Sequence, residues 1–168
     1  MLTQDQIRRA FEALSDELAK EGVKAELCLY GGAAFCLAFN ARPATRDVDA
    51  VFEPSAIVRD AARQVGLRLA LGENWLNDAV KGFVVPHPKR VLLDLPALKV
   101  YVAEADYLLA MKALASRVDA TDKDDVLFLI RELDLKTPAE VFEILSRYYP
   151  NEQIKPATQY FIEELFQR

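Results

Sequence analysis

The stretch 27–52 constrains this chain most, because it sets segments of different character in a fixed order. An apolar run ends in the adjacent glycines Gly31 and Gly32, and a small apolar segment follows. After a basic turn, the chain resumes as a strand-like run that contains Asp47 and Asp49. A Gly-Gly step after an apolar strand lets backbone N–H groups approach an anion where a helix begins. The order therefore predicts a strand, a glycine turn, a short buried helix and a second strand.

The carboxylates of Asp47 and Asp49 are predicted to share one face of the second strand, because side chains alternate along a strand. Two rises of ~3.3 Å separate them by about 6–7 Å along the backbone. Oxygen ligands at this spacing can share a hard cation such as Mg²⁺, which takes carboxylates together with substrate phosphates. A solvated strand face is the alternative, although Val51 shares this face and argues against full solvation. Adjacent metal and phosphate sites would suit phosphoryl or nucleotidyl transfer.

Composition excludes several other classes of protein. The chain has 168 residues, 52% hydrophobic and 28% charged, which predicts a globular protein with a real core. A net charge of −5 disfavours general coating of nucleic acid or anionic membranes. No apolar run approaches the ~20 residues of a membrane span and no signal-peptide pattern is present, so we expect a cytoplasmic protein without a membrane partner. One histidine, His87, leaves almost no material for histidine-based zinc sites or catalytic triads.

The secondary-structure pattern predicts an α+β fold in two parts. Residues 1–103 read as an α/β core with a small sheet flanked by helices, and residues 104–168 read as a helical extension packed on that core. A capping box at Thr3–Gln6 opens the first helix, and the third helix is expected to end at Gly66. Trp75, in a polar loop, is interpreted as that loop's anchor. The strands are expected over 25–30, 47–52, 84–85, 91–95 and 98–102.

The glycine pair, the basic turn 42–46 and the D-x-D strand together resemble the polymerase-β-type nucleotidyltransferase superfamily. Members of that superfamily place a Gly-Gly or Gly-Ser turn before a helix, followed by a D-x-D strand that holds the catalytic metals. Gly32 stands where many relatives have a serine whose hydroxyl binds phosphate. In this chain, that contact would fall to backbone N–H groups.

The downstream half adds a second resemblance. Lys112, Arg117 and the pair Asp122-x-x-Asp125 are similar to the K…R…D-x-x-D arrangement of AbiEii-type abortive-infection nucleotidyltransferases, which occur in bacterial toxin–antitoxin systems. The resemblance covers about residues 25–130, and the loop around Trp75 looks like an uncharacterised branch of these proteins. On the residues alone, Lys112 can equally be a lysine that extends to solvent. A helix start, where acids favour the macrodipole, is the favoured interpretation of Asp122 and Asp125.

The resemblance implies a nucleotidyltransferase-like mixed sheet and an Mg²⁺-dependent enzyme. Such an enzyme transfers a nucleotide from a nucleoside triphosphate to a hydroxyl acceptor, which is an RNA or tRNA end or a protein side chain. The implied metal ligands are Asp47, Asp49 and Asp94. The implied triphosphate contacts are Gly31, Gly32, Arg42, Thr45, Arg46 and Lys112. The implied catalytic set is Asp47, Asp49, Asp94, Lys112, Asp122 and Asp125, with Asp122 or Asp125 orienting Lys112 or acting on the acceptor hydroxyl.

Three alternatives stay open at this point. Asp94 is the candidate third acid because it interrupts an apolar strand, and if it faces solvent only two acids remain. The chain could then be a catalytically weak or inactive nucleotidyltransferase-fold protein that acts as one half of a toxin–antitoxin pair or as another binding partner. RNA binding without chemistry would be favoured by one continuous basic surface, and its candidate residues are Arg42, Arg46, Lys81, Lys89, Arg90 and Lys112.

Overall fold

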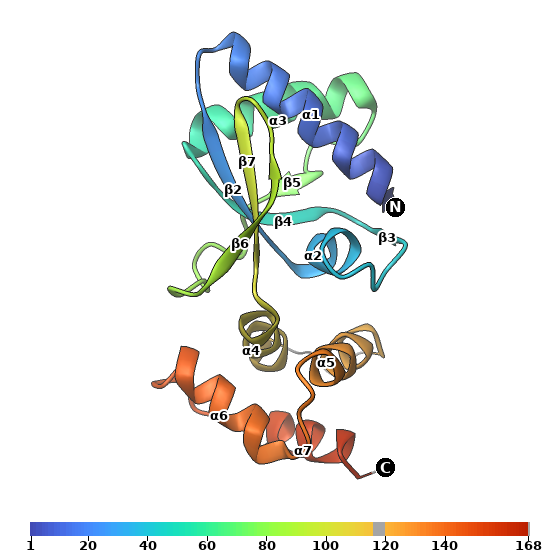
Figure 1. The fold of residues 1–168 in the computed structure, drawn as a ribbon, viewed down its shortest axis with the longest axis vertical. Helices are drawn as coiled ribbons and strands as arrows, with labels where there is room; N and C mark the ends of the chain where they lie inside the picture. The colour runs from blue at the N-terminus through green and yellow to red at the C-terminus, as the bar shows by residue number, and fades with distance from the viewer. Residues whose placement is uncertain (116–119, 168) are drawn as a thin grey trace. The chain divides into compact units, whose positions relative to one another are not determined.

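The computed structural model describes residues 1–115 and 120–167, and it confirms the α+β class (Figure 1). The chain divides into two compact units. Unit 1 comprises Met1–Val84 and Lys89–Ala103, and unit 2 comprises Val85–Pro88 with the chain from Glu104 onward. The predicted boundary after residue 103 coincides with the division before Glu104, and only residues 85–88 are grouped differently. The packing of the helical extension on the core stays a prediction.

Unit 1 is built on a mixed five-stranded sheet in the order β5-β4-β2-β7-β6. Its strands are β2 (Ala25–Tyr30), β4 (Val48–Glu53), β5 (Leu76–Asn77), β6 (Lys89–Asp94) and β7 (Leu98–Ala103). The central strand β2 runs antiparallel to β4 and parallel to β7. The short strands β1 (Leu2–Thr3) and β3 (Ala44–Thr45) form a separate antiparallel pair. Residues 84–85, predicted as a strand, are irregular.

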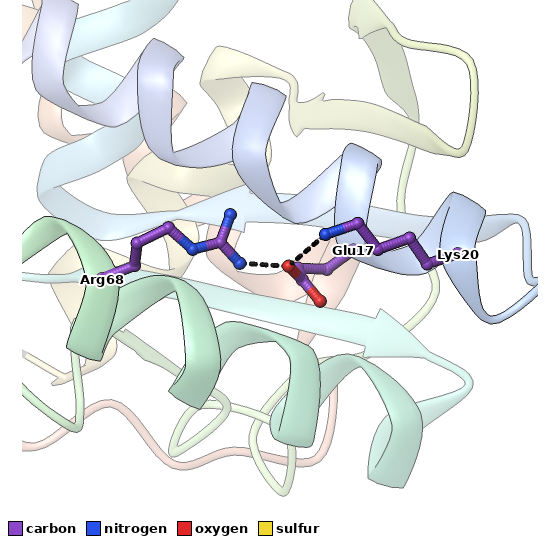
Figure 2. A network of polar contacts seen from close by, with 3 residues as sticks. All are labelled: Glu17, Lys20 and Arg68. Atoms are coloured by element: carbon purple, nitrogen blue, oxygen red, sulfur yellow. Dashed lines mark hydrogen bonds and ion pairs between the residues drawn. The ribbon is translucent and has the colours of Figure 1, made fainter.

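Two long helices, α1 (Gln4–Lys20) and α3 (Ser55–Leu69), pack side by side on one face of this sheet (Figure 1). The predicted capping box opens α1, because Thr3 Oγ1 accepts from the Gln6 amide and Gln6 Oε1 accepts from the Thr3 amide. At the other end of α1, Glu17 accepts from Lys20 at 3.1 Å and from Arg68 of α3 (Figure 2). The bond from Arg68 is the main reason that the pKa of Glu17 is lowered.

Helix α3 does not end at Gly66, as the sequence suggested, but continues to Leu69. Gly66 lies inside the helix at a position where neighbouring groups leave no room for a side chain. A Cβ at this position would lie 2.6 Å from the Gly72 carbonyl oxygen and 2.9 Å from Trp75 Cδ1. A glycine that appeared to stop the helix is therefore a close-packing position within it.

Trp75 anchors its loop, as predicted. The side chain is buried, and Nε1 donates to the Ala62 carbonyl of α3 at 2.8 Å. Its ring lies 6.3 Å from that of Phe11 on α1, centroid to centroid. The Trp75 carbonyl accepts from the Val48 amide at 2.7 Å. The tryptophan thus ties α3 to the start of β4.

Unit 2 consists of helices α4 (Ala105–Ala115), α5 (Ala120–Glu132), α6 (Pro138–Tyr148) and α7 (Pro156–Leu165). Residues 85–88 belong to it because Tyr107 of α4 holds them. The Tyr107 hydroxyl accepts from the Val85 amide at 3.1 Å and is 2.8 Å from the Tyr149 hydroxyl. The His87 ring stacks on the Tyr107 ring at 4.0 Å. In neither described range is there a helix both long and apolar enough to cross a membrane.

Candidate functional site

The glycine turn lies directly beside one of the predicted acids. Strand β2 ends at Tyr30, and helix α2 (Gly31–Leu37) begins at Gly31, whose φ of +63° is in the left-handed region. Tyr30 pairs with Asp49 across the β2–β4 ladder. A Cβ on Gly31 would lie 2.8 Å from Asp49 Oδ2. The Asp49 carboxylate therefore rests against bare backbone, and only glycine suits both that contact and that φ.

The second glycine faces two further predicted residues. A Cβ on Gly32 would lie 2.3 Å from Thr45 Oγ1 and 3.1 Å from Arg42 Nη1. Thr45 is buried and its hydroxyl donates to the Asp47 carbonyl at 3.2 Å. The Arg42 guanidinium lies over the Phe35 ring of α2, 5.5 Å from its centroid. A serine at position 32 has no space here, because the Thr45 hydroxyl already occupies it.

The alternation expected of the D-x-D strand is seen within β4, but the strand begins at Val48 and not at Asp47, which lies on the bend before it. Val48 and Ala50 are buried, whereas Asp47, Asp49 and Val51 are half-buried. Two carboxylates on one cation stay a prediction for Asp47 and Asp49.

Asn77 is a site residue that the sequence analysis missed. It lies on β5, opposite Asp49 in the parallel β4–β5 ladder. Its Nδ2 donates to Asp47 Oδ2 at 3.2 Å. The only signal in the sequence is an amide two residues after the anchoring Trp75. A carboxylate that binds metal usually needs such a hydrogen-bonding partner.

Asp94 does not join the pair, so its assignment as the third acid was wrong. It is exposed at the end of the edge strand β6. Asp94 pairs with Lys99 on β7, and Lys99 pairs with Glu26 near the start of β2. Asp49 pairs with Tyr30, at the end of β2. Four rises make about 13 Å along β2, and three strand spacings make about 14 Å across the sheet. Asp94 is at the far corner and, being exposed, needs no partner.

The donor set that remains is small. Among the residues that the structure describes, no group of three or more His, Cys, Asp or Glu side chains is arranged to hold a metal ion. Asp47 and Asp49 therefore form a two-carboxylate set. Mg²⁺ is commonly bound by one or two carboxylates plus substrate phosphates, so the set fits a cation that arrives with its phosphates. The predicted phosphate contact Arg46 is exposed on the bend before β4.

The three downstream residues form a cluster within unit 2. Lys112 of α4 donates to Asp122 Oδ1 at 2.9 Å and contacts Asp125 Oδ2 at 2.8 Å, both on α5. Burial disfavours the charged lysine, but the bonds to Asp125 and Asp122 outweigh it and raise the pKa of Lys112. The two acids thus hold Lys112 in its charged form, as one interpretation of the D-x-x-D pair expected. Arg117 lies outside the described residues.

The predicted site residues are thus distributed over both units. Unit 1 brings Gly31, Gly32, Arg42, Thr45, Asp47 and Asp49 together around one turn, whereas Lys112, Asp122 and Asp125 lie together in unit 2. No family model matches the sequence, and neither a curated protein nor a solved structure matches it.

Proposed function

We propose that the chain is an Mg²⁺-dependent nucleotidyltransferase that moves a nucleotide from a nucleoside triphosphate to a hydroxyl acceptor. One observation carries the proposal. The Asp49 carboxylate lies against Gly31, and Gly32 next to it lies against Arg42 and Thr45. A carboxylate pair for a cation and a glycine turn for an anion thus share one end of the sheet.

Each residue of this cluster has a definite role in the proposed reaction. Asp47 and Asp49 would hold the cation, which would neutralise charge on the attacking acceptor oxygen and on the leaving pyrophosphate of an in-line displacement. The backbone amides of Gly31 and Gly32 and the Arg42 guanidinium bind the phosphates. Stacking on Phe35 keeps the guanidinium in place, so that less freedom is lost when it binds. Helix α2 has only seven residues, so Arg42 rather than a helix dipole would supply the positive charge.

The role of Lys112 in triphosphate binding stays a prediction. Asp122 and Asp125 already neutralise its charge within unit 2. Any contribution to phosphate binding would therefore compete with two carboxylates at less than 3 Å. For this reason, the proposed triphosphate site rests on the residues of unit 1.

Labelling by a radioactive nucleoside triphosphate tests the proposal. The protein is incubated with each triphosphate, Mg²⁺ and cell extract, and a labelled acceptor is expected. Asp49→Asn should abolish labelling, because it removes one of two metal-binding charges. Asp94→Asn is the matched control, since it makes the same change on an exposed acid at the other end of the sheet. Equal labelling by the wild type and the Asp49→Asn variant would contradict the proposal.

A second candidate is a nucleotidyltransferase-fold protein that binds without turnover, as one partner of a toxin–antitoxin pair. The two-carboxylate donor set favours it, because the resemblance implies a third acid and Asp94 does not supply one. Calorimetry separates the two candidates. Metal-dependent triphosphate binding without any labelled acceptor would favour the binding protein. Labelling that is lost in Asp49→Asn would favour the enzyme.

A further inference from the structure

We propose that Asn77 is a positioning residue that orients the Asp47 carboxylate for the cation. The proposal rests on the function proposed above and extends it to a residue outside the D-x-D strand. Asn77 Nδ2 donates to Asp47 Oδ2 at 3.2 Å, and Asn77 Oδ1 accepts from the Ala79 amide at 3.2 Å. Because both ends of the side-chain amide are engaged, its orientation is determined. The opposite orientation would place Oδ1 against a carboxylate oxygen.

The strand that carries Asn77 is fixed to the core on two sides. In the β4–β5 ladder, Leu76 pairs with Val48 and Asn77 pairs with Asp49, and Leu76 is buried. One residue earlier, Trp75 is bonded through its indole to α3 and through its carbonyl to the start of β4. A two-residue strand would have little order of its own. Its attachment to Trp75 makes the Asn77 amide a fixed donor.

The surroundings of Asn77 explain why the residue that faces Asp47 is an amide. The next residue, Asp78, accepts from Arg59 of α3 at 2.7 Å and is thus directed to a cation of its own. A carboxylate at position 77 would repel Asp47, whereas an amide donates to it. Asn77 and Asp78 also line a hollow of about 200 Å³, together with Arg59 and Asn74 among other residues.

The bond from Asn77 leaves Asp47 able to bind a cation. An ionised carboxylate has about four lone-pair positions, and Asn77 uses one of them. The other positions are then held in one orientation instead of rotating with the side chain. Removing hydrogen-bonding partners of metal ligands typically lowers metal affinity by about 10–100-fold. We expect a loss within that range when Asn77 loses its donor.

Titration with Mn²⁺, followed by calorimetry, tests the proposal without requiring turnover. Asn77→Leu should raise the Kd for Mn²⁺ by about 10–100-fold. Asn74→Leu is the matched control in the same loop, where Asn74 is exposed, and it should leave the Kd unchanged. Thermal unfolding of both variants reports whether the loop remains folded.

Asn77→Ser removes the donor even if Asn77→Leu unfolds the loop. Its shorter side chain is polar but ends before the position of Nδ2, so it should raise the Kd for Mn²⁺ in the same way. In an Asp47→Asn background, titrated with Mn²⁺ and triphosphate, neither Asn77 variant should cause a further loss, because the carboxylate that Asn77 orients has been replaced. Merely structural damage to the loop would weaken binding in both backgrounds.

The outcomes separate the two proposals. Weaker binding in Asn77→Leu and Asn77→Ser with unchanged binding in Asn74→Leu, together with no further loss in the Asp47→Asn background, supports the role of Asn77. If Asp47→Asn loses Mn²⁺ binding while both Asn77 variants bind like the wild type, Asn77 has no positioning role and the proposed function stands. If the wild type binds no Mn²⁺ in the presence or absence of triphosphate, the proposed function fails and the role of Asn77 fails with it.

Discussion

Gly31→Ala tests the contact that carries the proposed function. Two costs follow from the structure. An alanine at the φ of +63° costs about 1–2 kcal/mol, because the Cβ approaches the backbone in the left-handed region. In addition, Asp49 Oδ2 must move from 2.8 Å to at least 3.4 Å from the new Cβ, where ordinary contact begins. Turning that carboxylate away from its preferred rotamer costs about 0.5–1.5 kcal/mol.

Gly22→Ala provides the matched control for the first of these costs. Gly22 has nearly the same φ, +67°, and no atom lies within 4 Å of a Cβ built there. Both variants lose the same backbone freedom in the unfolded chain, so that effect cancels in the comparison. Urea unfolding of the two variants should therefore differ by about 0.5–1.5 kcal/mol, with Gly31→Ala the less stable. The difference measures the contact with Asp49 alone.

A double-mutant cycle shows whether the excess arises from Asp49. In an Asp49→Ala background, Oδ2 is absent, and Gly31→Ala should cost no more than Gly22→Ala. Binding of Mn²⁺ should be weaker in Gly31→Ala and unchanged in Gly22→Ala, because only the first variant displaces a proposed metal ligand. Equal unfolding free energies for the two single variants would refute the contact. Persistence of the excess in the Asp49→Ala background would refute its assignment to Asp49.

Two further predictions concern unit 2. Lys112→Met should lower the free energy of unfolding by about 3 kcal/mol, because it removes one partner of a buried ion pair with Asp125. Lys136→Met, which removes an exposed lysine, should leave the free energy of unfolding nearly unchanged in the same urea titration, and equal losses would contradict a structural role for the cluster. Burial and a hydrogen bond to a carboxylate raise the pKa of Tyr148 to about 12, so an ultraviolet titration should show one tyrosine ionising there. The raised pKa favours the neutral phenol in the folded chain. Its contribution to the free energy of unfolding is therefore complete below about pH 10 and is lost as the pH rises through about 12. Tyr148→Phe should remove this dependence of stability on pH.

The parts of the site that could be predicted are those governed by local sequence. The alternation of side chains along a strand needs no knowledge of the rest of the fold, and the burial of residues along β4 follows it. The glycine pair after an apolar strand predicted a turn that starts a helix, and Gly31 adopts the left-handed conformation there. The same holds for Thr3, whose capping box depends on four consecutive residues. Each of these features is decided within one turn of helix or one strand.

The parts that could not be predicted depend on register and on packing between distant segments. Asp94 interrupts an apolar run, which suggested a buried acid, but the run forms an edge strand whose end is exposed. Only the strand pairing through β7 and β2 shows that Asp94 lies at the other end of the sheet from Asp49. Gly66 was predicted to end its helix because a glycine after an apolar helical pattern usually does so. The contacts that require glycine there, with Gly72 and Trp75, arise from packing and cannot be deduced from the neighbouring residues. Asn77 lies 30 positions from Asp47, so no local pattern links them.

The departure at Gly32 illustrates how packing changes the meaning of a motif residue. On sequence grounds, the contact that a serine hydroxyl makes with phosphate in many relatives would fall to backbone N–H groups here. The structure shows that Thr45 Oγ1 would lie 2.3 Å from any Cβ at position 32, so a hydroxyl occupies that space from another strand. Its hydrogen bond to the Asp47 carbonyl places it at the start of the acid strand. Because the Thr45 hydroxyl uses its single hydrogen on that carbonyl, it can only accept and does not replace the serine as a phosphate donor. The proposed function therefore assigns phosphate binding to the glycine amides and to the Arg42 guanidinium beside them.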